Sequence, residues 1–113
     1  MTFDIHLAHF DTEEEAVAQL DELGMTAVAL DFGAETSAMH WHDFDSRVYV
    51  VDGNLHIDYD DGRSCDLHHG DMIEAPARVV HREVTQGYRA VIGFSVDPTT
   101  LSMPINKPAA ELA

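Results

Sequence analysis

Two histidines separated by one residue, His40 and His42, are the side chains with the clearest capacity for chemistry in this sequence. The apolar run Val48–Val51 that follows is typical of a β-strand, and Asp52-Gly53 is expected to close it with a turn. Alternate side chains of an extended chain point to the same face, so both imidazoles should face one side. They are a start for a metal site, which needs at least one further ligand.

A second stretch, from Gly70 to His81, carries the other chemical signal. Gly70-Asp71 starts a strand from a turn, Pro76 interrupts that strand, and His81 lies on the strand that resumes. By strand alternation Glu83 shares the face of His81, which makes it an inward-pointing acid. We expect Glu83 to act as an acid–base group or to support a metal ligand, with a solvated position on the pocket rim as the alternative reading.

Together, the two stretches resemble the cupin superfamily. Its first motif has His-x-His, usually a Glu a few residues later, and a Gly after an apolar strand. Its second motif begins with Gly-Asp, has a Pro in the middle and ends with a His. The matching residues are His40, His42, Gly53, Gly70, Asp71, Pro76 and His81. The resemblance covers about residues 25–96 and implies a double-stranded β-helix, or jelly-roll barrel, in which His40, His42 and His81 bind one divalent metal.

The sequence departs from the cupin motifs at three positions. Ser46 stands where the family has its Glu, Arg47 occupies the alternative position, and Arg78 replaces a Gly of the second motif. Three neutral imidazoles would leave a divalent metal with a local charge near +2, which favours an anionic ligand. Imidazole binds iron, nickel, zinc and copper alike, so the metal stays open. We expect Ser46 to line the substrate pocket. Arg78 either pins an anionic substrate at the pocket mouth or covers the barrel end.

The N-terminal residues 1–24 are expected to form one strand and one helix. Phe3–Leu7 alternates apolar and polar residues, as in a half-buried strand. Thr12 followed by Glu15 is a capping-box pattern, and it predicts a helix from Thr12 to Leu23 with a glycine stop after it.

The remainder should be mostly β-structure. Strands are predicted at Met25–Phe32 and Tyr88–Val96, with a loop at 33–37, a tight hairpin around Asp61-Gly62 and a turn at Gln86-Gly87. Residues 25–97 would form the barrel core. The tail, 98–113, contains three prolines, which argue against further strands, and is expected to pack along the outside or to be partly disordered. The predicted fold is a mostly β, single-domain jelly-roll barrel with one N-terminal α-helix.

Composition restricts the class of partner. The chain has 113 residues with 6 basic and 21 acidic side chains, a formal charge of −15. Such a charge disfavours nucleic acid and anionic membrane surfaces. The single cysteine, Cys65, excludes an internal disulfide and should be an inert packing residue. We see no signal peptide and no apolar run long enough for a membrane span, so a cytoplasmic location is expected.

These features predict a metal-binding protein that acts on a small molecule. Three-histidine centres of cupin-like proteins occur in non-haem iron dioxygenases, so the resemblance implies a dioxygenase-type oxidoreductase. The alternatives are a non-catalytic ligand-binding or sensor protein and a metal-assisted isomerase or lyase. A homodimer is expected, and Trp41, on the face opposite the histidines, should pack in the core or at an interface. The remaining histidines, His6, His9, His56, His68 and His69, are expected to be solvated.

Overall fold

Two long antiparallel strands, β4 (Ser46–Tyr59) and β7 (His81–Phe94), are the frame of the molecule. The computed structural model describes residues 2–101 and 105–112. The other strands are β1 (Asp4–His6), β2 (Thr26–Thr36), β3 (His40–Trp41), β5 (Ser64–His68), β6 (Met72–Ala75) and β8 (Lys107–Pro108). The helices are α1 (Glu13–Glu22) and two short 3-10 helices, η1 (Pro98–Thr100) and η2 (Ala109–Leu112).

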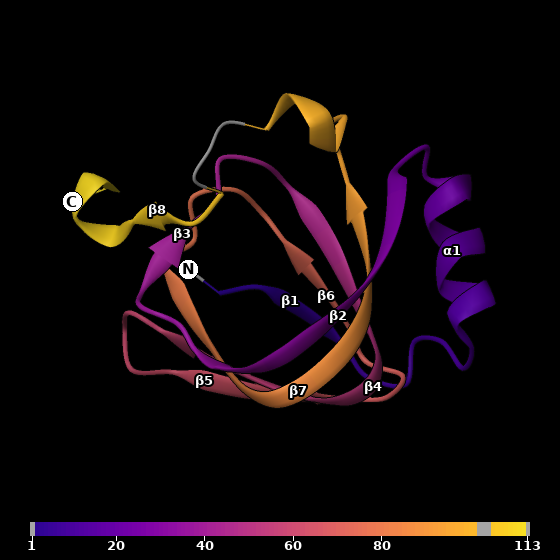
Figure 1. Ribbon diagram of the computed structural model, residues 1–113, viewed down its shortest axis with the longest axis horizontal. Coiled ribbons are helices and arrows are strands. Elements are labelled where there is room, and N and C mark those ends of the chain that lie inside the picture. The colour runs from indigo at the N-terminus through magenta and orange to yellow at the C-terminus, as the bar shows by residue number, and fades with distance from the viewer. Residues whose placement is uncertain (1, 102–104, 113) are drawn as a thin grey trace.

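All strand pairs are antiparallel and belong to one strongly curved sheet (Figure 1). β2 and β4 lie on the two sides of β7. β6 pairs with the first part of β4 and β5 with its last part, while β1 extends the sheet beyond β6. β3 joins the start of β7 to β8. This arrangement confirms the predicted mostly β jelly-roll barrel with one N-terminal helix.

The bend of β4 across β7 depends on two glycines. The register of β4 against β7 shifts between Val50 and Asp52 and again between Gly53 and His56. At the bend Gly53 has φ +78°, and a Cβ atom placed on it would lie 2.3 Å from the carbonyl oxygen of Gly87. Only glycine allows this backbone conformation and this close approach. The predicted turns at Asp52-Gly53 and Gln86-Gly87 are therefore wrong: both pairs lie inside continuous, bent strands.

The helix α1 follows the local sequence signals closely. Thr12 caps it by accepting a hydrogen bond from the backbone N–H of Glu15, and the Glu15 carboxylate accepts from the N–H of Asp11. α1 lies outside the barrel (Figure 1). Its buried Leu20 packs on Gly93 of β7, where an added Cβ would come within 2.3 Å of the leucine side chain. The glycine thus lets the helix approach the sheet closely.

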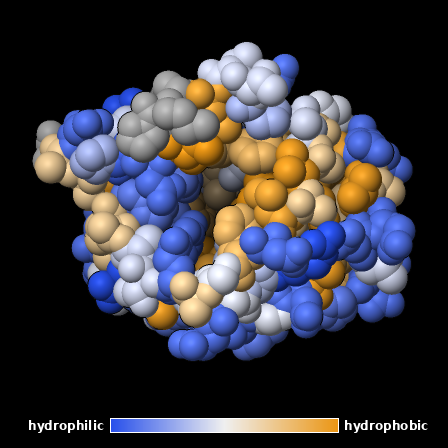
Figure 2. Space-filling view, in the orientation of Figure 1, coloured by the Kyte–Doolittle hydropathy of each residue, from blue (hydrophilic) through white to orange (hydrophobic). Residues whose placement is uncertain are grey.

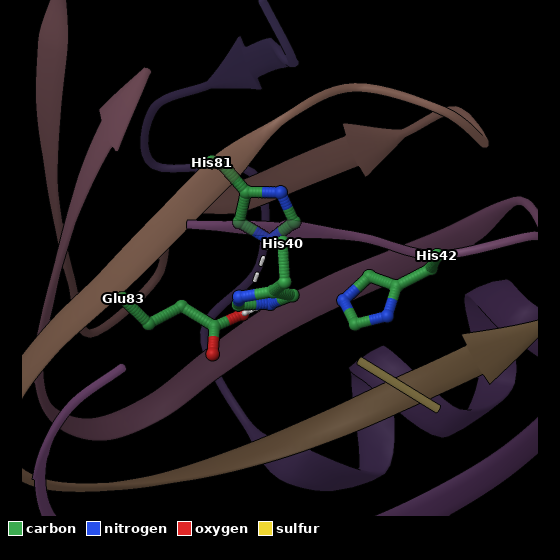
Figure 3. A group of neighbouring side chains, drawn as sticks. All are labelled: His40, His42, His81 and Glu83. Carbon is green, nitrogen blue, oxygen red and sulfur yellow. Dashed lines mark hydrogen bonds and ion pairs between the residues drawn. The ribbon is translucent and has the colours of Figure 1, made fainter. Parts of the chain in front are cut away.

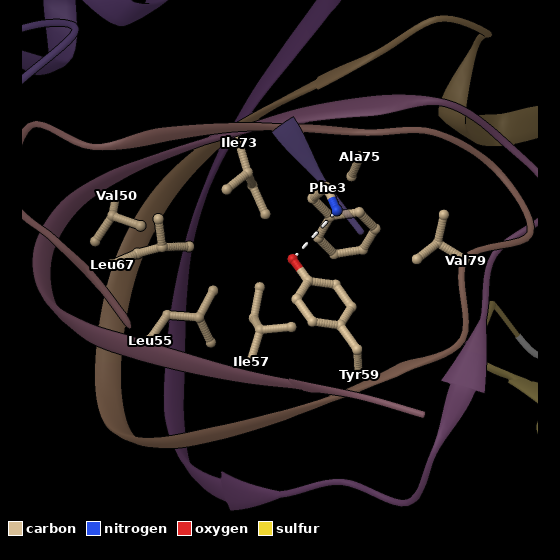
Figure 4. Packing of buried hydrophobic residues seen from close by; sticks show 9 residues of the cluster. All are labelled: Phe3, Val50, Leu55, Ile57, Tyr59, Leu67, Ile73, Ala75 and Val79. Atoms are coloured by element: carbon tan, nitrogen blue, oxygen red, sulfur yellow. Dashed lines mark hydrogen bonds between the residues drawn. The ribbon is translucent and has the colours of Figure 1, made fainter. Parts of the chain in front are cut away.

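Apolar side chains form two clusters, one inside the barrel and one beneath α1. The inner cluster joins residues from β4, β5, β6 and the N-terminus, and includes Phe3, Leu55, Ile57 and Ile73 (Figure 4). Within it the Tyr59 hydroxyl accepts a hydrogen bond from the backbone N–H of Phe3. The outer cluster contains Phe10, Ala16, Leu20, Tyr49, Met72 and Val91. The N-terminal segment therefore closes one side of the barrel interior.

Three further predictions need correction. In the first strand only Phe3 is buried; Ile5 and Leu7 are exposed because β1 is an edge strand that pairs with β6 alone. β2 runs on to Thr36 through the predicted loop, since β7 pairs with it along almost its whole length. The tail forms the short strand β8 despite Pro108. Residues 102–104 lie outside the described part of the chain.

Candidate metal centre

Four side chains converge at one end of the barrel: His40, His42, His81 and Glu83 (Figure 3). Each offers one ligand atom, and these atoms all lie within 4.8 Å of one another. A divalent metal about 2.1 Å from each ligand atom keeps them about 3 to 4 Å apart, so the cluster is only slightly wider than a filled site. Across residues 2–101 and 105–112 it is the one such group of histidine, cysteine and acidic side chains.

Strand pairing explains why residues distant in sequence meet here. His40 in β3 is the register partner of His81, the first residue of β7, and His81 also pairs with Tyr59 at the end of β4. His42 directly follows β3. Glu83 stands two residues beyond His81, so strand alternation directs it to the same side. The pairing of β3 with β7 thus brings the His40/His42 pair next to the His81/Glu83 pair.

Each histidine is oriented by a hydrogen bond from Nδ1 to a backbone carbonyl. The distances are 2.8 Å from His40 to Ala38, 3.1 Å from His42 to Ile105 and 2.9 Å from His81 to Val79. A carbonyl can only accept, so Nδ1 carries the proton in each ring. Nε2 is then left as the nitrogen with a free lone pair, which is the arrangement that metal-ligating histidines need.

Two polar contacts at the centre show whether the residues fit a metal ion. Nε2 of His40 is buried and has no hydrogen-bond partner among the described residues. Nε2 of His81 lies 3.3 Å from Oε1 of Glu83, although its Nδ1–H is already donated to Val79. A cation at this point would contact both His81 and Glu83. A divalent metal would satisfy both histidines at once, so the residues present fit a metal ion.

The protonation preferences of the cluster agree with metal binding. Burial lowers the pKa of His42 below 6.5, although its hydrogen bond to the Ile105 carbonyl opposes this shift. Burial raises the pKa of Glu83, but the hydrogen bond to His81 and the three neighbouring imidazoles outweigh it and hold that pKa below 4.5. At neutral pH His42 is neutral and Glu83 is ionised, the forms in which both bind metals.

The comparisons with known proteins agree with this geometry. A family model described as a cupin domain matches residues 27–96, more than half of the chain. The chain belongs to the cupin family. The match covers both histidine-bearing stretches, so the motif resemblance and the observed fold point to the same family. A comparison with curated proteins gives no match.

Several solved structures share this cupin fold. A DUF861 family protein from Thermotoga maritima matches with a TM-score of 0.62 and 14% identity, over 82% of this chain and 99% of the other. An RmlC-like cupin from Shewanella frigidimarina has a TM-score of 0.55 and 29% identity, over 66% of this chain and 68% of the other. The EutQ protein of Clostridium difficile has a TM-score of 0.55 and 22% identity, over 66% and 60%.

The acid of this cupin's cluster comes from β7, not from the first motif. Ser46 and Arg47 stand where a carboxylate was expected, and Arg47 instead forms an ion pair with Glu74 at 2.8 Å. Glu83 joins the three histidines. Glu83, which strand alternation places on the face of His81, is thus the acid that could offset the charge of a metal held by the three histidines. A divalent metal held by all four side chains would carry a local charge near +1.

A cavity of about 280 Å³ opens from the metal cluster into the barrel. His42, His81, Glu83 and Ser46 line it, which places Ser46 in its wall as expected. Most other lining residues are aromatic or branched aliphatic; they include Phe3, Phe32, Phe44, Val48, Tyr88 and Ile92. In the space-filling view the face that looks into the barrel is hollowed, and hydrophobic residues gather along one side of the hollow (Figure 2).

Arg78 does not line this cavity, and of the two roles expected for it the structure agrees with the second, covering the barrel end. Its guanidinium lies over the Trp41 ring, 5.6 Å from the centroid, and it borders a separate surface hollow beside η2. Its φ is +70°, which explains why glycine is usual at this motif position. The Trp41 indole N–H donates to the Pro108 carbonyl at 3.0 Å. Arg78 and Trp41 thus cover the barrel end and hold the tail.

The other histidines and the cysteine lie outside the cluster. His6 pairs with Glu74, and His9 and His68 are exposed. His56 pairs with Asp58 and Asp66, and His69 binds the Val51 carbonyl. Burial raises the pKa of the Cys65 thiol, so the thiolate is disfavoured and the residue is a packing residue. In the described residues, no helix is long and apolar enough to cross a membrane.

Proposed function

We propose that this cupin is a metal-dependent enzyme of the non-haem dioxygenase type that acts on a small molecule. His40, His42, His81 and Glu83 would hold the divalent transition metal. The observation that carries the proposal is the convergence of four ligand atoms, with three Nε2 lone pairs fixed by backbone hydrogen bonds, at the wall of a largely apolar cavity. A structural metal would have no need of a cavity at its open side.

A bound divalent metal supplies Lewis-acid polarisation of a substrate oxygen and, if it is redox-active, exchange of electrons with dioxygen. The protein's own contribution is binding and exclusion of water. The apolar walls keep water away from the reacting group, and the ring positions fixed by Ala38, Ile105 and Val79 keep the ligands preorganised. Within the ligand set Glu83 lowers the local charge and helps to hold the metal.

The cavity wall favours oxidation over sugar chemistry. An isomerase or lyase acting on a sugar needs hydrogen-bonding partners for several hydroxyl groups, because unpaired polar groups are costly to bury. Beyond the ligands, the polar lining residues in the described chain are Ser46, Asn106 and the hydroxyl of Tyr88. Dioxygen is apolar, so it can enter such a cavity without leaving a polar group unpaired. This supports the oxidoreductase reading.

Oxygen uptake by metal-loaded protein tests the proposal. Tag-free protein is loaded separately with iron(II), nickel, copper or zinc and offered diketones, flavonols and thiols. We expect oxygen consumption with at least one redox-active metal, none with zinc, and loss of activity in H81A. The variant H68A, which removes an exposed histidine outside the cluster, should keep it.

Other outcomes would contradict the proposal. Substrate turnover without oxygen uptake would show a metal-assisted isomerase or lyase. Tight binding without any turnover would show a non-catalytic ligand-binding cupin. Activity that survives in H81A would mean that the ligands are wrongly assigned.

A further inference from the structure

The walls of the cavity identify the class of molecule that it takes. We propose that the site accepts a small compound with an apolar, branched or aromatic body and one oxygen-bearing head that carries at most a single negative charge. This rests on the proposed function, since the head would meet the metal held by His40, His42, His81 and Glu83. It goes further by specifying the size and polarity of the part of the ligand that does not contact the metal.

Half of the polar side chains that line the cavity belong to the metal cluster. His42, His81 and Glu83 form part of the ligand cluster. Asn106 follows Ile105, whose carbonyl accepts the Nδ1–H of His42, so its backbone lies near this cluster too. The body of the cavity is lined by apolar residues from several elements, among them Phe3, Phe44, Leu55, Ile73, Ala75 and Ile92. A ligand therefore presents one polar end and buries the rest against hydrocarbon.

The charges of the wall limit the charge of the ligand. Glu83 is the only lining residue of the described chain with a permanent charge at neutral pH. The six basic residues all lie elsewhere: Arg47, Arg63, Arg78, Arg82, Arg89 and Lys107. A divalent metal with Glu83 has a net charge of +1, which neutralises one anionic oxygen head. A second anionic group would be buried without a partner, which is strongly unfavourable. Phosphorylated sugars, nucleotides and dicarboxylates are thereby excluded.

The volume limits the size of the ligand. A cavity of about 280 Å³ lies near the lower limit of about 300 Å³ for pockets that hold small molecules. A branched six-carbon acid with a neighbouring keto oxygen fills such a space. Each additional apolar carbon buried should tighten binding by about fourfold. Discrimination between an apolar and a charged body of similar size should therefore be large.

Two keto acids with the same head and different bodies test the inference. The dissociation constants of 4-methyl-2-oxopentanoate and 2-oxoglutarate are measured by calorimetry on the full chain, both zinc-loaded and metal-stripped. Zinc is redox-inert, so no turnover interferes. We expect 4-methyl-2-oxopentanoate to bind the zinc-loaded chain at least tenfold more tightly than 2-oxoglutarate, with removal of the metal weakening both ligands. Equal affinities, a reversed preference, or failure of both ligands to bind at millimolar concentration would overturn the inference.

A matched pair of variants locates the binding site. A75L fills the cavity from β6, and A29L adds the same side chain at an exposed position of β2. We expect A75L to weaken 4-methyl-2-oxopentanoate at least tenfold while zinc content stays unchanged, and A29L to have no effect. Unchanged ligand affinity in A75L would contradict the assignment. If the wild-type chain binds no metal at all, the proposed function and this inference both fail; zinc binding without a preference between the two keto acids overturns this inference alone.

Discussion

At the scale of single residues, backbone carbonyls decide which nitrogen of each histidine is available. Ala38, Ile105 and Val79 each accept a Nδ1–H, and this leaves three Nε2 atoms directed at one point beside Glu83. Carbonyl acceptors of this kind fix the tautomer and the ring orientation before a metal arrives. The metal affinity of the site should therefore depend on the acid and on the supporting carbonyls as well as on the imidazoles.

The variant E83Q should weaken metal binding by at least tenfold, because glutamine keeps the size of the side chain and removes the charge that balances the metal. Competition with a chromophoric chelator measures the affinity. E35Q removes an acid from an exposed position of β2 and is the matched control. An affinity in E83Q equal to that of the control would show that Glu83 is not a ligand.

His56 should make stability depend on pH. Hydrogen bonds to Asp66 and then Asp58 raise its pKa above 6.5 in the folded state. Protonated His56 therefore stabilises the fold fully below about pH 6.5, and this contribution is lost as the pH rises through the folded-state pKa. H56Q should lower the free energy of unfolding by a few tenths of a kcal/mol to about 1 kcal/mol at pH 6, and by less at pH 9.

Urea denaturation across this pH range measures the difference for H56Q. H68Q, at an exposed position of β5, is the control. A difference between H56Q and wild type that stays constant with pH would contradict the electrostatic explanation.

At the scale of elements, the bends of β4 and β7 bring the two halves of the cluster together. Gly53 and Gly87 lie back to back at the bend, and beyond it the last residues of β4 pair with the first residues of β7, which include His81. A straight β4 would not wrap the barrel and would leave His81 away from β3. Gly53, the glycine of the first motif, thus affects the site by allowing β4 to bend.

The variant G53A should lower the free energy of unfolding more than G62A does. Both glycines have positive φ, so alanine costs each about 1 to 2 kcal/mol of backbone strain. Only at Gly53 would the new methyl also meet backbone, 2.3 Å from the Gly87 oxygen, whereas nothing lies within 4 Å at Gly62. Urea denaturation should give a difference of at least about 1 kcal/mol between the variants. Equal losses would show that the close approach relaxes without penalty.

The tail should support the metal site through Ile105. Truncation after Leu101 removes the carbonyl that orients His42, while truncation after Pro108 keeps it together with β8. Loss of such a supporting contact commonly weakens metal binding by about 10- to 100-fold. We expect this loss in the shorter chain only, measured by chelator competition. Similar affinities for both truncated chains would show that the tail does not position His42.

Local signals predicted some elements and misread others for a physical reason. The helix was predictable because Thr12, Glu15 and Gly24 act within a few residues of one another. The glycines at 53 and 87 were mistaken for turns, because a tight turn and a bend within a long strand need the same backbone freedom. Only the long-range pairing of β4 with β7 distinguishes the two.

The site was predictable to a similar extent. The three histidines followed from motif spacing, and alternation placed Glu83 on the face of His81. Its position among the ligands depends on the pairing of β3 with β7, which no local pattern contains. The apolar wall is likewise assembled from separate strands. The spacing of residues in the sequence therefore could not show that Arg78 lies outside the cavity.

At the scale of the whole molecule, the chain combines a strongly acidic composition with a cavity whose wall has little charge. The formal charge of −15 attracts divalent cations and repels polyanions, whereas the apolar interior selects for uncharged or singly charged ligands. The cluster of His40, His42, His81 and Glu83 could bind a divalent cation, and it borders the apolar cavity. We therefore expect this cluster to hold a metal.

The metal content of tag-free protein, measured by mass spectrometry after loading and desalting, tests that claim most directly. We expect about one equivalent of divalent transition metal per chain in the wild type and in H68A, and less than about a tenth of an equivalent in H42A. A wild-type protein that retains no metal, or an H42A variant that retains a full equivalent, would contradict it.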